Sequence, residues 1–178
     1  MCYPEWLPDI VQVSPWCNGG KNDTYEMLYQ IFCRDIKNHT LKYIGCNVWF
    51  FNELEDGKEK IFWHLTSREQ KARKVPRRKK RFYNTDTIPA ERLPDLRRSE
   101  RLPWVKSLIE NSSKCEVLAW DYEEGNGNTK TYVWLKDYDF VIIMKKYRND
   151  SRRLITSFYV DVGYKRQDFK RKYDHRIQ

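Results

Sequence analysis

Glycine and proline are scarce in this sequence, and no long apolar segment occurs. There are 7 residues of each type among 178, while 40% of the residues are hydrophobic. Such a composition excludes a collagen-like repeat and disfavours disorder as the main state. The longest apolar run, Phe140 to Met144, is far too short to span a bilayer. We therefore expect a single folded domain over residues 1–178, without a membrane partner.

Cysteine spacing excludes two further classes. The five cysteines are an odd number and contain no C-x-x-C pair. A dense disulfide framework and a zinc site with paired ligands are both disfavoured, so we expect reduced thiols. The first residues, MCYPEWLPDI, lack the basic and apolar regions of a secretory signal. Together these features predict a cytoplasmic protein.

Motifs of several enzyme classes are also missing. The sequence has no G-x-x-x-x-G-K loop, G-x-G-x-x-G turn, G-x-S-x-G elbow or H-E-x-x-H helix. Carboxylate pairs such as Asp137 and Asp139 lie in expected turns without a histidine partner. We therefore predict no metal and no cofactor, and a metal-dependent nuclease is disfavoured.

Positive charge is concentrated in one segment. Lys and Arg total 34 against 25 acidic residues, a net charge of +9, and residues 71–81 (KARKVPRRKKR) contain 8 basic residues and no acid. Without that segment the balance would be 26 − 25 = +1. Such density is typical of a surface that binds RNA or DNA, although a solvated loop that contacts nothing remains the alternative. The predicted substrate-binding side chains are Arg68, Lys71, Arg73, Lys74, Arg77, Arg78, Lys79, Lys80 and Arg81.

Periodicity predicts an α+β fold with a basic, mobile loop at 70–90 and an N-terminal arm at 1–22. A helix is expected after Asp23, with Glu26 completing a capping box. Its apolar face would comprise Tyr25, Leu28, Ile31, Phe32 and Ile36. Two β-prone runs, 47–54 and 59–66, flank Asp56-Gly57 and predict a hairpin.

For the second half of the chain, the sequence predicts a helical region, an antiparallel meander and a final helix. Residues 93–111 look helical in two pieces, with Asp95 capping the first and Pro103 opening the second. Strands are expected at 115–122, at 130–135 with 137–146, and at 152–162, joined by Gly- and Asn-containing turns. A basic helix over about 164–176 closes the domain.

His64 is the candidate acid or base. The sequence has three histidines, and only His64 lies beside the basic segment, at the end of the expected strand 59–66. A histidine in that position suits acid–base cleavage of a phosphodiester, but a hydrogen-bonded structural role is the alternative.

Arginines and hydroxyls could complete such a site. Arg97 and Arg101 are one helical turn apart and could present a fork to a phosphate, with Glu100 orienting one of them. A plain salt-bridge network is the alternative. Thr156 and Tyr159 are polar groups on an otherwise apolar strand, either site residues or core hydroxyls. Exposed members of the 27 aromatic residues could stack on unpaired bases.

Metal-free chemistry with these groups favours RNA as the target. The ribose 2′-OH supplies an internal nucleophile, so the protein need only deprotonate it, stabilise the charge on phosphorus and protonate the leaving oxygen.

The order of motifs resembles a known superfamily. FWHLTSRE, IPAERLPDLRRSERLPWVKSLIEN, VLAWDYEEGNGNTKTYVWLKDYDFVIIMKK and LITSFYVDVGYKRQDFKRKYD together resemble the phage- and prophage-associated nucleases of the barnase–EndoU–colicin–RelE (BECR) superfamily. The resemblance covers about residues 25–178. It implies an N-terminal helix packed on an antiparallel sheet of four to five strands, and a metal-independent endoribonuclease of toxin type. The implied partners are RNA (tRNA, rRNA or mRNA) and an antitoxin or immunity protein.

Site roles follow from the resemblance position by position. His64 would be the acid or base, Arg98 and Arg101 would bind the scissile phosphate, and Trp104 would be a supporting anchor in substrate binding. Thr156 and Tyr159 would orient the phosphate or the 2′-OH. The basic insertion at 71–81 departs from the family pattern. Two alternatives stay open, a non-catalytic RNA- or DNA-binding protein and a protein-interaction module; an exposed His64 near Arg98 or Arg101 would favour cleavage.

Overall fold

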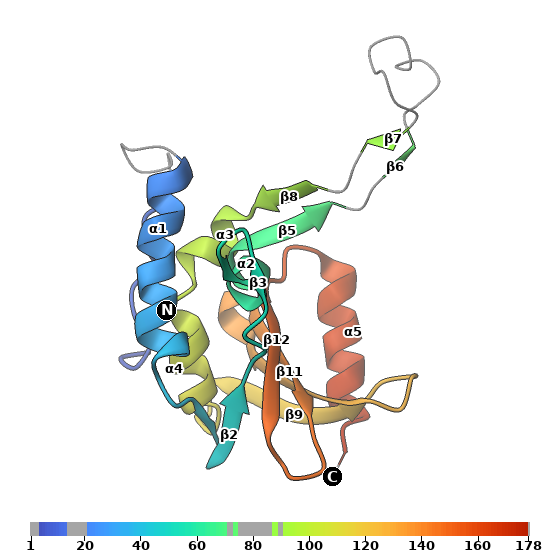
Figure 1. Ribbon diagram of the computed structural model, residues 1–178. Coiled ribbons are helices and arrows are strands. Elements are labelled where there is room, and N and C mark those ends of the chain that lie inside the picture. The colour runs from blue at the N-terminus through green and yellow to red at the C-terminus, as the bar shows by residue number, and fades with distance from the viewer. Residues whose placement is uncertain (1–3, 14–20, 71–72, 75–86, 89–90, 178) are drawn as a thin grey trace.

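A mixed β-sheet forms the centre of the protein (Figure 1). The computed structural model describes residues 4–13, 21–70, 73–74, 87–88 and 91–177. Within these residues the main sheet has six strands, in the order β1-β2-β12-β11-β10-β9. Their bounds are β1 Lys42–Tyr43, β2 Cys46–Trp49, β9 Val117–Glu123, β10 Thr129–Leu135, β11 Phe140–Lys146 and β12 Arg152–Tyr159.

The last four strands form the predicted antiparallel meander. Their turns contain Gly127, Asp139 and Asp150, all with positive φ, which glycine and aspartate adopt more readily than other residues. The expectation of four to five antiparallel strands is wrong in one respect. β2 joins β12 in parallel, with Arg153 opposite Trp49, and β1 extends the sheet beyond it.

Helices cover both faces of the sheet. On one face, α1 (Lys21–Phe32), which continues as a π-helical turn over Cys33–Lys37 (η1), and α4 (Trp104–Glu110) contribute to the larger core. On the other face lies α5, Gly163–Asp174 (Figure 1). Its Phe169 packs against aromatic residues of the meander. The predicted apolar face of the first helix is confirmed, since Leu28, Phe32 and Ile36 are fully buried. Asp23 lies in the first turn of α1 rather than before it, so its predicted capping position is wrong.

The segment after β2 contains a correction that matters for the site. The turn at Asp56-Gly57 is confirmed, with φ of 49° and 75°, and it joins the short strands β3 (Leu54–Glu55) and β4 (Lys58–Glu59). The strand expected over 59–66 is instead helix α2, Lys60–Thr66. Ile61, Phe62 and Leu65 are all buried, and only a helix brings residues at this spacing to one side.

Paired strands occupy the described residues at both ends of the predicted 70–90 loop. β5 (Ser67–Gln70) pairs with β8 (Glu91–Pro94), and β6 (Arg73–Lys74) pairs with β7 (Thr87–Ile88). These described parts of the predicted 70–90 loop are therefore a hairpin arm (Figure 1). Lys71, Arg77, Arg78, Lys79, Lys80 and Arg81 lie outside the described residues.

Two helical pieces follow, as predicted. In α3 (Leu96–Glu100), the Asp95 side chain accepts a hydrogen bond from the Arg98 amide at 3.3 Å, and Pro103 precedes α4. The described part of the N-terminal arm packs against the body, because Leu7 and Val13 are buried and the Val11 amide donates to the Glu100 oxygen.

Among the residues that the structure describes, no helix has the length and apolar character needed to span a membrane. Cys33, Cys46 and Cys115 are free thiols.

Candidate functional site

His64 lies on the exposed side of α2. Its neighbours Ile61 and Leu65 are buried in the core and hold the helix against the body. His64 is therefore accessible, and a helix presents its imidazole rather than the predicted strand end.

The C-terminal end of α2 is fixed by side-chain hydrogen bonds to the carbonyl oxygens of its last turns, which add to main-chain bonds such as that from the Ser67 amide to the Trp63 oxygen. Thr66 Oγ1 donates to the Phe62 oxygen at 2.9 Å, and Ser67 Oγ donates to the Trp63 oxygen at 2.6 Å. The guanidinium of Arg98 donates to the His64 oxygen at 2.8 Å. These contacts set the orientation of the turn that carries His64.

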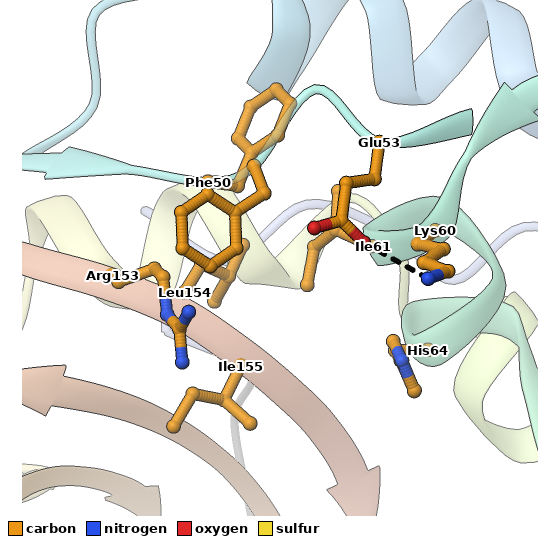
Figure 2. Close-up of a pocket in the computed structure, with 9 residues that line it drawn as sticks. Phe50, Glu53, Lys60, Ile61, His64, Arg153, Leu154 and Ile155 are labelled. Carbon is orange, nitrogen blue, oxygen red and sulfur yellow. Dashed lines mark hydrogen bonds and ion pairs between the residues drawn. The ribbon is translucent and has the colours of Figure 1, made fainter.

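A pocket of about 350 Å³ opens beside His64 (Figure 2). Its walls come from α2, from the segment after β2 and from β12. The lining residues are Phe50, Phe51, Glu53, Lys60, Ile61, His64, Arg153, Leu154 and Ile155. Figure 2 shows His64 and Lys60 projecting from α2, and Arg153 reaching in from β12 on the other side of Ile155.

Two cations and one carboxylate line this pocket. Lys60 Nζ lies 2.9 Å from Glu53 Oε2, and this hydrogen bond raises the pKa of Lys60 and lowers that of Glu53. Both groups are consequently charged at neutral pH. The Arg153 guanidinium stacks over the Phe51 ring at 4.4 Å. The pocket thus combines positive charge with an aromatic surface.

The imidazole of His64 is held in its neutral form. Partial desolvation lowers the pKa of His64 below its ordinary value of 6.5, and the positive charges of Arg92 and Arg98 lower it further, against the opposing effect of Glu55. A neutral imidazole at pH 7 can accept a proton, as a general base must.

Arg98 joins α3 to α2 and β12. Besides the His64 oxygen, its guanidinium donates to the Ser67 oxygen at 3.3 Å and to Thr156 Oγ1 at 3.4 Å. It also lies 3.0 Å from the buried carboxylate of Asp95. Thr156 Oγ1 in turn donates to the His64 oxygen at 3.3 Å. The structure therefore brings three of the predicted site residues into contact, through the main chain of His64.

Arg101 and Tyr159 form a second group on the α3 side of β12. The Arg101 guanidinium lies 5.1 Å from the ring centroid of Tyr159 and 3.3 Å from Glu100 Oε2. Arg97 stacks on the same tyrosine ring at 4.6 Å. The alternative of a salt-bridge and stacking network thus describes the present contacts of Arg101.

Trp104 and Arg68 occupy positions that differ from their predicted substrate-binding roles. Trp104 is 0% exposed, and its indole nitrogen donates to the Pro8 oxygen at 2.8 Å, so it supports the site only from within the core. The half-exposed Arg68 forms ion pairs with Asp95 and, at 3.3 Å, with Asp161.

Sequence reasoning missed Lys60, Glu53 and Arg153. A helical interpretation of 60–66 would have found Lys60, because residues four apart share a helix face with His64. Arg153 gave no such signal, since only the packing of β12 beside the 50–53 segment brings it to the pocket.

Among the described residues, no group of three or more His, Cys, Asp or Glu side chains is placed to hold a metal ion. Comparison of the chain with protein-family models, with curated proteins and with solved structures gave no match.

Proposed function

We propose that this protein is a metal-independent endoribonuclease with His64 as its general base. The observation that carries the proposal is the exposed, neutral imidazole at the edge of a pocket that also holds Lys60 and Arg153. A base and two cations around an open space are what 2′-OH attack on phosphorus requires.

In the proposed reaction, His64 accepts the proton of the ribose 2′-OH. The 2′-oxygen then forms a bond to phosphorus while the bond from phosphorus to the 5′-oxygen breaks. A water molecule in the open pocket gives a proton to the leaving 5′-oxygen and takes up the proton that His64 accepted, so the imidazole returns to its neutral form. Lys60 and Arg153 stabilise the negative charge on the phosphoryl oxygens, since charge-assisted contacts of this kind are strongest when charge develops. The product carries a 2′,3′-cyclic phosphate.

Arg98 and Thr156 act in this proposal as positioning residues, because both contact the His64 main chain. Direct phosphate contacts by Arg98, Arg101 and Tyr159 stay a prediction from the motif resemblance. The same holds for membership of the barnase–EndoU–colicin–RelE superfamily and for the toxin role with an antitoxin partner. What supports the resemblance is the order of the motifs and the α+β fold.

The test is incubation of total RNA and tRNA in EDTA with wild type and the His64→Ala variant. We expect fragments with 2′,3′-cyclic phosphate ends from wild type and a loss of roughly 10²- to 10⁴-fold in rate for His64→Ala, the range typical of a positioned base. His39→Ala is the control, since His39 is partly exposed but pairs with Glu110 at 2.7 Å, outside the pocket.

The outcomes separate the alternatives. Equal cleavage by wild type and His64→Ala would show that the protein is a ribonuclease but would reject His64 as its general base. Absence of cleavage with intact, salt-sensitive RNA binding would favour a non-catalytic binding protein. Absence of both would favour the protein-interaction module.

A further inference from the structure

Three aromatic rings run in series away from the His64 pocket. The ring centroid of Phe51 lies 5.3 Å from that of Trp49, and Trp49 lies 5.4 Å from Tyr147. Phe51 is 49% exposed, and the other two are partly exposed. We call Phe51, Trp49 and Tyr147 the aromatic row. Contiguous exposed rings of this kind usually mark a binding surface.

Two cations accompany the aromatic row. Arg153 on β12 pairs in register with Trp49 on one side and with Lys145 of β11 on the other, so all three point to the same sheet face. Arg153 stacks on Phe51 at 4.4 Å, and Lys145 lies 5.4 Å from the Tyr147 ring centroid. Neither cation lies within ion-pair distance of a carboxylate in the described part of the chain, although the charge of Arg153 contributes to lowering the pKa of Glu53.

A second pocket, of about 570 Å³, lies at the other end of the aromatic row. It is lined by Gly127, Asn128, Thr129, Lys145, Lys146, Tyr147, Arg148 and Asp150. Tyr147 belongs to both the row and this pocket, which Lys145 also lines. Phe51 belongs to both the row and the His64 pocket, which Arg153 also lines. The row therefore joins the two pockets along one continuous surface.

We propose that this surface binds an unpaired stretch of RNA that extends from the scissile phosphate at His64 to the second pocket. The proposal rests on the proposed function and adds the substrate class, which is single-stranded RNA of several nucleotides. Aromatic side chains can stack only on bases that are not already stacked in a duplex, and cations between them neutralise the phosphates. The alternation of rings and unpaired cations favours a polynucleotide over a protein partner.

Binding can be measured apart from cleavage with a fluorescently labelled 2′-O-methyl RNA 12-mer, which lacks the attacking hydroxyl. Fluorescence anisotropy would compare wild type with Phe51→Leu and Tyr147→Leu, which keep apolar volume but remove a ring. We expect each variant to bind about tenfold more weakly, within the range found when a stacking aromatic is removed. Circular dichroism of each variant checks that it is folded.

The cations are tested by the salt dependence of the same binding. The double variant Lys145→Ala/Arg153→Ala should reduce the slope of log K against log salt by about 1.4, because each single-strand phosphate contact contributes about 0.7. The double variant Lys106→Ala/Lys114→Ala is the matched control. It removes the same charge from α4 and the turn after it, and α4 packs in the core of the opposite sheet face.

Failure of this proposal is distinguishable from failure of the proposed function. If Phe51→Leu and Tyr147→Leu bind the 12-mer as tightly as wild type, the proposed RNA-binding surface is rejected, even if His64-dependent cleavage is found. Weakened binding by these variants would support it even if the protein does not cleave. Equal affinity for a 12-bp duplex would reject the preference for single strands. Tighter binding of the 2′-deoxy 12-mer would indicate that the ligand is DNA rather than RNA.

Discussion

Arg98 donates a hydrogen bond of 2.8 Å from its guanidinium to the main-chain oxygen of His64. The bond joins α3 to the C-terminal turn of α2, where a cation also interacts favourably with the negative end of the helix dipole. The same guanidinium lies 3.0 Å from the carboxylate of Asp95, which caps α3. Orientation of the candidate base therefore depends on a pair of charged groups from the next helix.

We expect Asp95 and Arg98 to be energetically coupled. Asp95→Ala removes the only carboxylate that pairs with the largely buried Arg98 guanidinium in the described residues, so it should lower the free energy of unfolding by about 3 kcal/mol. Arg98→Ala leaves Asp95 paired with Arg68 but removes the bonds to the His64 and Ser67 oxygens, so it should cost about 2 kcal/mol. The double variant should lose clearly less than the sum of the two, because the interaction between Asp95 and Arg98 is lost only once. Urea unfolding of the four proteins measures this.

Arg97→Ala is the control for that cycle. Arg97 is exposed on the same helix and only stacks on Tyr159, so its loss should change the free energy of unfolding by about 0.5 kcal/mol or less. Strict additivity of Asp95→Ala and Arg98→Ala would contradict the coupling.

The His64 imidazole should titrate below pH 6.5, because desolvation and the charge of Arg92 disfavour its protonated form. The Arg92→Gln variant should move the midpoint to higher pH, since it removes one of these positive charges. NMR titration of the histidine ring protons measures both midpoints without any need for activity. In the cleavage assay, log kcat/KM should fall as the pH drops through the same midpoint, since only the neutral imidazole accepts a proton.

Arg34→Gln controls for a general loss of positive charge, because Arg34 pairs with Asp35 on η1 and is not among the groups that shift His64. An equal upward shift of the His64 midpoint in Arg34→Gln would contradict a specific effect of the Arg92 charge. A wild-type midpoint above pH 6.5 would contradict the lowered pKa of His64.

Lys60→Ala should lower kcat/KM for RNA cleavage by about 10- to 100-fold, as expected when one charge that stabilises the transition state is removed. Its side chain is half-exposed, so folding should be unaffected. Lys58→Ala is the control from the preceding strand β4, because Lys58 pairs with Glu26 at 2.7 Å and does not line the pocket. Similar losses in the two variants would remove Lys60 from the site.

Trp104 should affect stability rather than RNA binding. Trp104→Ala leaves a cavity in the core and should lower the free energy of unfolding by about 3–5 kcal/mol. Trp104→Phe retains most of the packing but loses the hydrogen bond to Pro8, so it should be destabilised less and bind the 12-mer as tightly as wild type. Weaker binding by a stably folded Trp104→Phe would restore the predicted role in substrate contact.

Local sequence patterns correctly predicted those helices and strands for which local propensity and the pattern of buried residues favour the same secondary structure. The meander strands alternate or run apolar between turn residues, and Asp95 and Pro103 have side chains that favour helix starts. The sequence also singled out His64 as a candidate, because a rare residue type stood beside an unusual charge pattern, and the structure places it on the exposed side of α2.

Tertiary structure decided the rest. Residues 60–66 are aromatic and β-prone, yet burying Ile61, Phe62 and Leu65 on one side requires a helix, so packing overrode local propensity. Likewise, Arg153 reaches the His64 pocket, and Trp49 stands beside Arg153, only because β2 pairs in parallel with β12. That pairing joins residues about one hundred positions apart, a contact that no local periodicity encodes. The sequence by itself therefore determined the meander and the helix starts at Asp95 and Pro103 and singled out His64, and the parallel pairing of two distant strands decided which charged and aromatic groups surround that histidine.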